Sequence, residues 1–179
     1  MICSSRGSIF VILLLVTAAG RAAEPTSSVP KAAAVMDFEL IDDMRDYESA
    51  AVLAAQNQRL VLIGDALRQE LQQRALYRVV DNNAAANLIA ASKARQELRD
   101  CNGCEVEIGR ALGADVVLIG WVQKVSNLIL NINVQARDVH SGTTLYARSV
   151  DLRSNTDTSW LRGIRYMVDG IAEDRDYLR

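Results

Sequence analysis

Residues 114–151 read ADVVLIGWVQKVSNLILNINVQARDVHSGTTLYARSVD, and the rest of the chain is organised around them. Val116 to Val125 is a nearly unbroken apolar run, which is typical of a strand buried on both faces and is expected at the centre of a sheet. From 128 to 137 apolar and polar residues alternate, which predicts a strand with one face in the core. Short connections make neighbouring strands antiparallel. The stretch therefore predicts a three-strand antiparallel meander, with Thr143 to Leu152 near an edge.

The segments that flank this stretch read as helices and shorter strands. We expect helices that pack on a mixed sheet, because helices are segregated from the run of strands. The predicted fold class is α/β (α+β), with a single mixed β-sheet that contains the meander. The expected elements are a strand at Ala32–Leu40, a helix at Arg59–Leu76, a strand at Tyr77–Asp81, a helix at Ala84–Leu98, a third helix that stops at Gly113, and a last helix with Trp160, Ile164, Met167 and Ile171 on its inner face.

The amino-terminal residues have the pattern of a secretory leader. Arg6 precedes a wholly apolar run, Ile9 to Val16, and small residues follow it, as in a cleavable signal peptide. We predict a signal peptide at 1–22, a flexible mature N-terminus at 23–31 and a single domain at 32–175. The protein is then periplasmic, and the alternative is an uncleaved leader that anchors it to the membrane.

Composition and motifs argue against several classes of function. The chain has 20 basic and 22 acidic residues, a formal net charge of −2, so it lacks the basic excess of a nucleic-acid-binding protein. P-loop, Rossmann and zinc-protease motifs are absent from the sequence, and no catalytic constellation stands out. We therefore expect no enzyme activity, no cofactor and no metal.

Cys101 and Cys104 form a C-x-x-C pair, and in an oxidising compartment they are expected to form a disulfide. The simplest interpretation is a structural bridge at the start of the third helix. A redox-active pair is the second interpretation, because a helix N-terminus favours a thiolate at Cys104. Asn102 and Glu105 have the spacing of a capping box. Zinc is disfavoured because His140 is the only histidine, and that residue lies in the turn Asp138–Gly142, where a solvated role is expected.

Three other groups of polar residues remain open to interpretation. The acidic loop Asp42 to Glu48 reads as a solvated loop and lacks the pattern of a calcium site. The polar members of the second meander strand suit either solvent or a wet interface. The segment before and within the last helix is either a capped surface helix or a partner-binding face, since Arg and Trp are enriched at interface hot spots. The candidate partner-binding residues are Asn155, Asp157, Trp160, Arg162 and Arg165, with the polar strand face Asn131, Asn133, Gln135 and Arg137 as the alternative.

Several short motifs together resemble a known group of proteins. Between roughly Ala33 and Ile171 the chain resembles the amino-terminal domain of the periplasmic protein TolB and, more loosely, CsgG-type secretion lipoproteins. It is most similar to a proteobacterial family of secreted or periplasmic proteins without an assigned function. The motifs are Asp37-Phe38, Arg78 to Asp81, Leu112 to Val122, Asp138 to Gly142, the C-x-x-C pair and Asn155 to Trp160. No β-propeller repeat and no lipobox accompany them, so neither TolB's whole function nor a CsgG-like pore carries over.

The resemblance implies a compact domain used for protein contacts. The first hypothesis is a non-catalytic periplasmic interaction or accessory protein, associated with a periplasmic dehydrogenase or an envelope assembly system. Its partner would be a periplasmic or envelope protein, with no nucleic acid and with membrane contact only through an uncleaved leader. The alternatives are a small-ligand-binding module, and a thiol–disulfide protein that uses Cys101 and Cys104.

Overall fold

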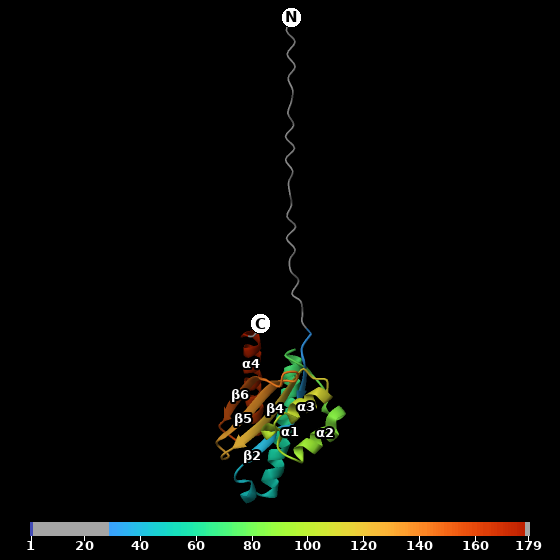
Figure 1. Ribbon diagram of the computed structural model, residues 1–179. Helices are drawn as coiled ribbons and strands as arrows, with labels where there is room; N and C mark the ends of the chain where they lie inside the picture. The colour runs from blue at the N-terminus through green and yellow to red at the C-terminus, as the bar shows by residue number, and fades with distance from the viewer. Residues whose placement is uncertain (2–28, 178–179) are drawn as a thin grey trace.

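The computed structural model describes Met1 and residues 29–177, with side chains to residue 174. The predicted leader and most of the predicted mature N-terminus lie outside the described residues. Six strands form one mixed sheet in the order β3-β1-β4-β5-β6, and β2 also pairs with β4 (Figure 1). The strands are β1 (Ala32–Val35), β2 (Glu39–Asp42), β3 (Arg78–Val79), β4 (Val116–Lys124), β5 (Leu130–Asp138) and β6 (Thr144–Leu152).

The meander has the predicted arrangement. Strand β4 pairs with β5, and β5 with β6, both antiparallel. On its other side β4 pairs in parallel with β1 and β2. The first meander strand is therefore central and β6 is an edge strand. The predicted fold class, a single mixed sheet with helices packed on it, is confirmed.

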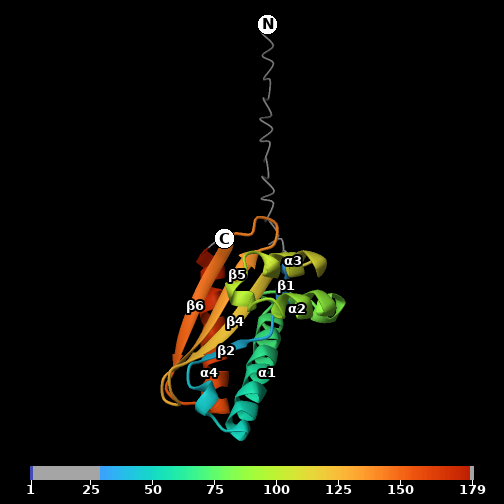
Figure 2. The same ribbon diagram turned by 60° about the horizontal axis from the view of Figure 1, so that its bottom comes forward.

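Helices cover both faces of the sheet, although unequally (Figures 1 and 2). Helices α1 and α4 pack together and bury the alternating apolar positions of β5, such as Ile132 and Val134, on one face. A smaller core on the other face lies under α3 and η3 and contains Val117, Ile119 and Val139. The helical segments are η1 (Arg45–Tyr47), α1 (Ala50–Gln73), η2 (Asn82–Ala85), α2 (Ala86–Lys93), η3 (Leu98–Asp100), α3 (Cys104–Ala111) and α4 (Asp157–Tyr177).

The predicted first strand, Ala32 to Leu40, is wrong as one element, because it breaks into β1 and β2 at residues 36–38. The ring of Phe38 turns onto β4 at Gly120, where an added Cβ would lie 2.5 Å from Phe38 Cε1. Arg68 Nη2 and Asn82 Nδ2 donate to the carbonyl of Val35 at 3.0 and 2.8 Å. Side chains thus satisfy a carbonyl at the end of β1, as buried backbone groups require.

Two helix boundaries also differ from the prediction. Helix α1 begins at Ala50, nine residues before the expected Arg59, because Ser49 Oγ accepts the N–H of Val52 and starts the helix. The expected helix from Ala84 to Leu98 is shorter and is divided into η2, α2 and η3. In the described part of the chain, no helix has the length and apolarity needed to cross a bilayer.

Candidate functional site

Large apolar side chains are exposed together at one end of the sheet. The hairpin between β4 and β5 carries Val125, Leu128 and Ile129, which are 59%, 71% and 61% exposed. The loop after β2 carries Met44 and Tyr47, at 49% and 83%. We call these five residues the tip. Exposed apolar residues are ordinary when scattered, but a group of them at one place marks a contact surface.

A buried ionic cluster holds the two parts of the tip together. Lys124 Nζ donates to Asp42 Oδ2 at 2.9 Å and to Glu48 Oε1 at 2.5 Å. The side chains of Lys124 and Asp42 are 3% and 1% exposed. Asp42 Oδ1 also accepts the N–H of Met44 at 3.1 Å. The loop that carries Met44 is thereby fixed beside the start of the hairpin.

The charge of Lys124 is retained in this setting. Burial alone would lower its pKa, but the hydrogen bonds to Glu48 and Asp42 outweigh burial and raise the pKa above its ordinary value. The interpretation of Asp42 to Glu48 as a wholly solvated loop is therefore wrong for its two ends, although Asp43 and Asp46 are exposed.

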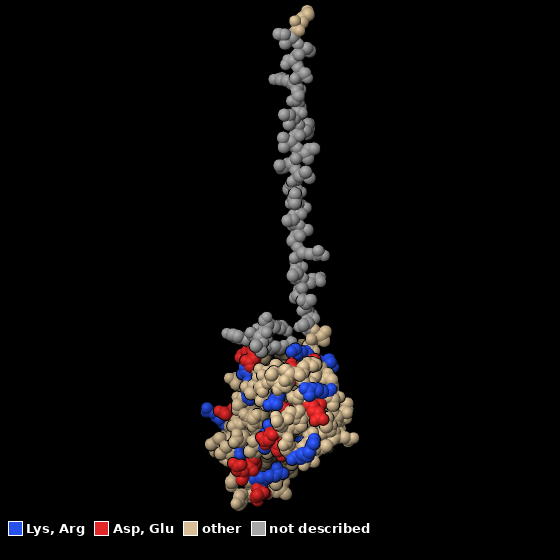
Figure 3. All heavy atoms as spheres, viewed as in Figure 1, with Lys and Arg blue, Asp and Glu red and all other residues tan. Residues whose placement is uncertain are grey.

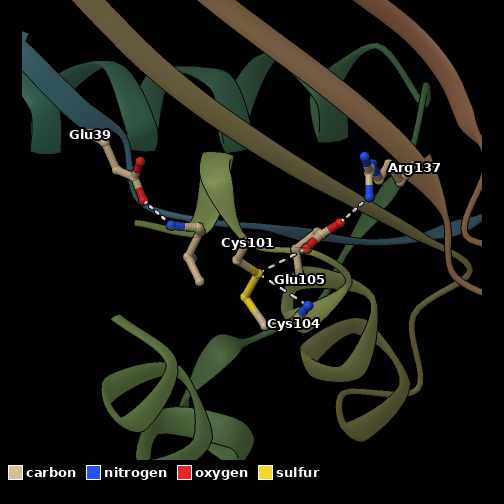
Figure 4. Close-up of a disulfide and its surroundings, with 6 residues drawn as sticks. Glu39, Cys101, Cys104, Glu105 and Arg137 are labelled. Atoms are coloured by element: carbon tan, nitrogen blue, oxygen red, sulfur yellow. Dashed lines mark hydrogen bonds and ion pairs between the residues drawn. A yellow bond between two sulfur atoms is a disulfide. The ribbon is translucent and has the colours of Figure 1, made fainter. Parts of the chain in front are cut away.

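A second group of polar contacts surrounds the cysteine loop. Cys101 and Cys104 are joined by a disulfide at the start of α3. Gly103 between them has φ of +100°, a left-handed conformation that glycine adopts without steric cost. The predicted capping box is wrong: Gly103 is the N-cap residue, with no side-chain cap bond. Glu105 is instead buried and turned toward Cys101 and Arg137 (Figure 4).

Contacts to two strands anchor this loop. Glu39 of β2 accepts the N–H of Leu98 at 2.7 Å and a bond from Arg99 Nη1 at 2.8 Å, which fixes η3 ahead of Cys101. Burial raises the pKa of the Glu39 carboxyl, and these two hydrogen bonds oppose the rise. On the other side, Arg137 of β5 donates to Glu105 at 2.5 Å. Figure 4 shows the disulfide between these two anchors.

The candidate residues around the start of the last helix are tied to one another. Asn155 Oδ1 accepts from Trp160 Nε1 at 3.1 Å and from Arg59 Nη1 at 3.3 Å, and Arg59 Nε donates to Asp157 at 2.7 Å. Asn155 Nδ2 donates to Asn127 of the hairpin at 3.0 Å. Trp160 is 0% exposed, so in this conformation it packs in the core and offers no surface to a partner.

The two candidate arginines lie nearer the surface. Arg162 and Arg165 are both exposed. Arg162 lines a cavity of about 740 Å³ between β6 and α4, together with Arg153 and several hydroxyl side chains. Small-molecule sites are mostly apolar, whereas this cavity is lined largely by polar and charged side chains. The described geometry therefore does not single it out as a small-ligand site.

The polar strand face and His140 have simpler surroundings. Asn131, Asn133, Gln135 and Arg137 are all half-buried. Asn133 Nδ2 donates to Asn131 at 2.6 Å, and Gln135 to Thr144 at 3.2 Å. His140 has a side chain that is 80% exposed, as expected for a solvated turn residue. The two signs of charge are interspersed over the face shown in Figure 3.

Sequence reasoning missed the tip. It also missed the contacts of Glu39 with η3 and of Glu105 with Arg137. The alternation places Leu128 among the core positions of the second strand, yet β5 begins only at Leu130. Two successive apolar residues, Leu128 and Ile129, next to a short turn were the available signal. The pairing of Glu105 with Arg137 carried no local signal, because the two residues meet only when β5 is placed beside α3.

The fold and these features define a small mixed-sheet domain with the tip at one end and a disulfide loop toward the other. The chain belongs to the DUF3280 family, described as "Protein of unknown function (DUF2380)", whose model matches residues 31–171. Curated proteins provided no match.

Solved structures resemble this chain at low sequence identity. TolB from Acinetobacter baumannii is 11% identical with a TM-score of 0.50, and the match covers 83% of this chain and 29% of that one. LpoB from E. coli is 15% identical with a TM-score of 0.47, covering 86% and 84%. A hypothetical protein from Chlamydia trachomatis is 11% identical with a TM-score of 0.47, covering 79% and 95%. The likeness to TolB agrees with the predicted fold.

Proposed function

We propose that this chain is a non-catalytic interaction or accessory protein of the periplasm, and that it binds a protein of the cell envelope through the tip. The tip is the observation that carries the proposal, since five large apolar side chains are exposed at one end of the sheet. The secretory pattern of residues 1–22 supports the location. Association with a periplasmic dehydrogenase or an envelope assembly system is the finer form of the same proposal.

The energetics suit a reversible complex. Full burial of a large apolar side chain contributes about 1.5–3 kcal/mol. The five residues of the tip, which are already partly buried, would contribute roughly 5–10 kcal/mol in total. Association costs about 4–15 kcal/mol in lost translational and rotational freedom. The tip alone therefore supports transient binding, and a longer-lived complex requires polar contacts at its rim.

The rim is available on the same loops. Arg45 and Asp46 of η1 are exposed and lie in the chain between the tip residues Met44 and Tyr47. Apolar patches with a polar rim are the usual anatomy of protein interfaces. The buried cluster of Lys124, Asp42 and Glu48 keeps this surface ordered before binding, which reduces the entropy lost on association.

The test is site-specific photo-crosslinking in the native periplasm. A photoreactive residue is placed at Leu128 or at Tyr47, and adducts are identified by mass spectrometry. The matched control is Val61 of α1, an apolar residue that is 65% exposed outside the tip. We expect the same envelope protein at both tip positions and not at Val61. In vitro, Leu128→Ser/Ile129→Ser should weaken binding to that protein at least tenfold. Equal adduct patterns at all three positions would refute the proposal.

A further inference from the structure

The two cysteines of the disulfide differ in exposure. Cys101 is 6% exposed, whereas Cys104 is partly exposed. Cys104 lines a cavity of about 730 Å³ beside α3. A thiol that approaches from solution therefore reaches the sulfur of Cys104 first. The charged side chains of this cavity are mostly basic: Arg95, Arg110 and Arg137, with Glu107 as the one acid.

A buried carboxylate faces the inner sulfur. Glu105 is 1% exposed, its Oε1 accepts a bond from Arg137, and its Oε2 lies 3.1 Å from Cys101 Sγ (Figure 4). A disulfide sulfur carries no hydrogen, so oxidised Cys101 cannot donate to this oxygen. The reduced Cys101 thiol can donate to it. The dithiol form thus gains a buried, charge-assisted hydrogen bond that the disulfide form lacks.

The backbone also favours release of Cys101. The N–H of Cys104 lies 3.1 Å from Cys101 Sγ and is directed at it. This N–H belongs to the first turn of the eight-residue helix α3, where the helix dipole stabilises negative charge. The buried Glu105 carboxylate opposes a thiolate at Cys101. The N–H therefore assists the departing sulfur, and Glu105 acts on the protonated thiol that follows.

We propose that Cys101 and Cys104 form a thiol–disulfide exchange centre that accepts an anionic peptide thiol, of the chemical class of glutathione, in the arginine-lined cavity. The thiolate of the incoming peptide attacks Cys104 Sγ and forms a mixed disulfide. The bond between the two cysteines breaks, and Cys101 leaves with the electron pair. Cys101 takes up the proton that the incoming thiol released to solvent, and it then donates a hydrogen bond to Glu105.

A second peptide thiol completes the exchange. It attacks the peptide sulfur of the mixed disulfide, Cys104 leaves, and the peptide disulfide is released. Two electrons and two protons have then passed from two thiols to the cysteine pair. The reverse reaction, with the peptide disulfide as oxidant, restores the bridge between Cys101 and Cys104. This centre lies toward the end of β5 opposite the tip, because Arg137 pairs with Val117 whereas Leu130 pairs with Lys124.

The experiment equilibrates the folded chain with mixtures of reduced and oxidised glutathione and then traps free thiols with a maleimide. Glu105→Gln is compared with Glu173→Gln, an exposed acid of α4 that does not line this cavity. We expect reduction of the wild type while it stays folded by circular dichroism, and a mixed disulfide at Cys104 only. Glu105→Gln should shift the equilibrium about tenfold toward the disulfide, and Glu173→Gln less than twofold.

A second measurement holds even where Glu105→Gln disturbs the fold. Arg110 is exposed, so Arg110→Gln should fold normally. It should slow attack by glutathione about threefold or more, through the weaker electrostatic attraction, while attack by uncharged 2-mercaptoethanol changes little. A bridge that resists glutathione until the protein unfolds is structural and would overturn the proposal. So would a mixed disulfide at Cys101, or equal slowing with both thiols.

Discussion

Removal of the Lys124 charge should destabilise the protein and loosen the tip. In Lys124→Met, the buried side chain of Asp42 and the nearly buried one of Glu48 lose their shared cation. Breaking a buried ion pair by removing one partner costs about 3–5 kcal/mol, because the remaining charge is left uncompensated. Glu48 keeps 14% exposure, so water can reach it, and we expect a loss near the lower end, about 3 kcal/mol.

The matched control replaces the whole cluster by neutral groups. Exchange of a buried ion pair for uncharged residues of similar volume is often neutral. The triple variant Lys124→Met/Asp42→Asn/Glu48→Gln should therefore recover most of the stability that Lys124→Met loses. Urea unfolding followed through the fluorescence of the buried Trp160 measures all three proteins. A loss below about 1 kcal/mol in Lys124→Met, or a triple variant less stable than the single one, would contradict the reasoning.

The pH dependence gives an independent check. The pKa of Lys124 is raised in the folded protein, so its contribution to stability is complete below pH 10.5 and is lost as the pH rises through the raised value. The stability difference between wild type and Lys124→Met should accordingly shrink in alkali.

Three further changes test other parts of the structure. Gly120→Ala places a Cβ 2.5 Å from the ring of Phe38, so the free energy of unfolding in urea should fall by about 1–3 kcal/mol. Adding Phe38→Leu to the same chain should recover part of this loss. Strictly additive losses would argue against the contact. Gly103→Ala must adopt φ of +100° and should lose about 1–2 kcal/mol, so an unchanged Tm would count against the described loop. The N–H of Ser141 and neighbouring bonds lower the pKa of Asp138 below 3.8, so its stabilisation is present above pH 3.8 and is lost as the pH falls through the lowered value. Asp138→Asn should reduce Tm more at pH 7 than at pH 3, and equal deficits at both would refute this.

Local patterns were sufficient for the elements that pack in a regular way. The alternation in β5 and the apolar run in β4 predicted the meander, because period two in a strand depends only on which face is buried. The inner face of α4 followed in the same way from helical spacing, and Ile164 and Met167 are buried as expected. Neither prediction required knowledge of a distant residue.

Features that depend on distant partners were beyond such patterns. The break after Val35 depends on Gly120 in β4, which makes room for Phe38. Glu105 has capping-box spacing, and only the placement of Arg137 shows its different role. The tip requires Lys124 and Asp42 to be paired across parallel strands. In each case the deciding contact joins segments far apart in the chain.

The parallel pairing of β1 and β2 with β4 also decides how the protein is oriented when it is held by one end. Strand β1 enters the sheet beside the start of β4, and β2 leaves it beside the end of β4. The nine residues of β4 span about 30 Å. A sensor chip or fusion partner joined ahead of Ala32 would therefore leave the tip facing outward, with the cysteine cavity toward the attached end. Immobilisation through that side suits measurements of protein binding, whereas exchange with peptide thiols is better measured with the chain free in solution.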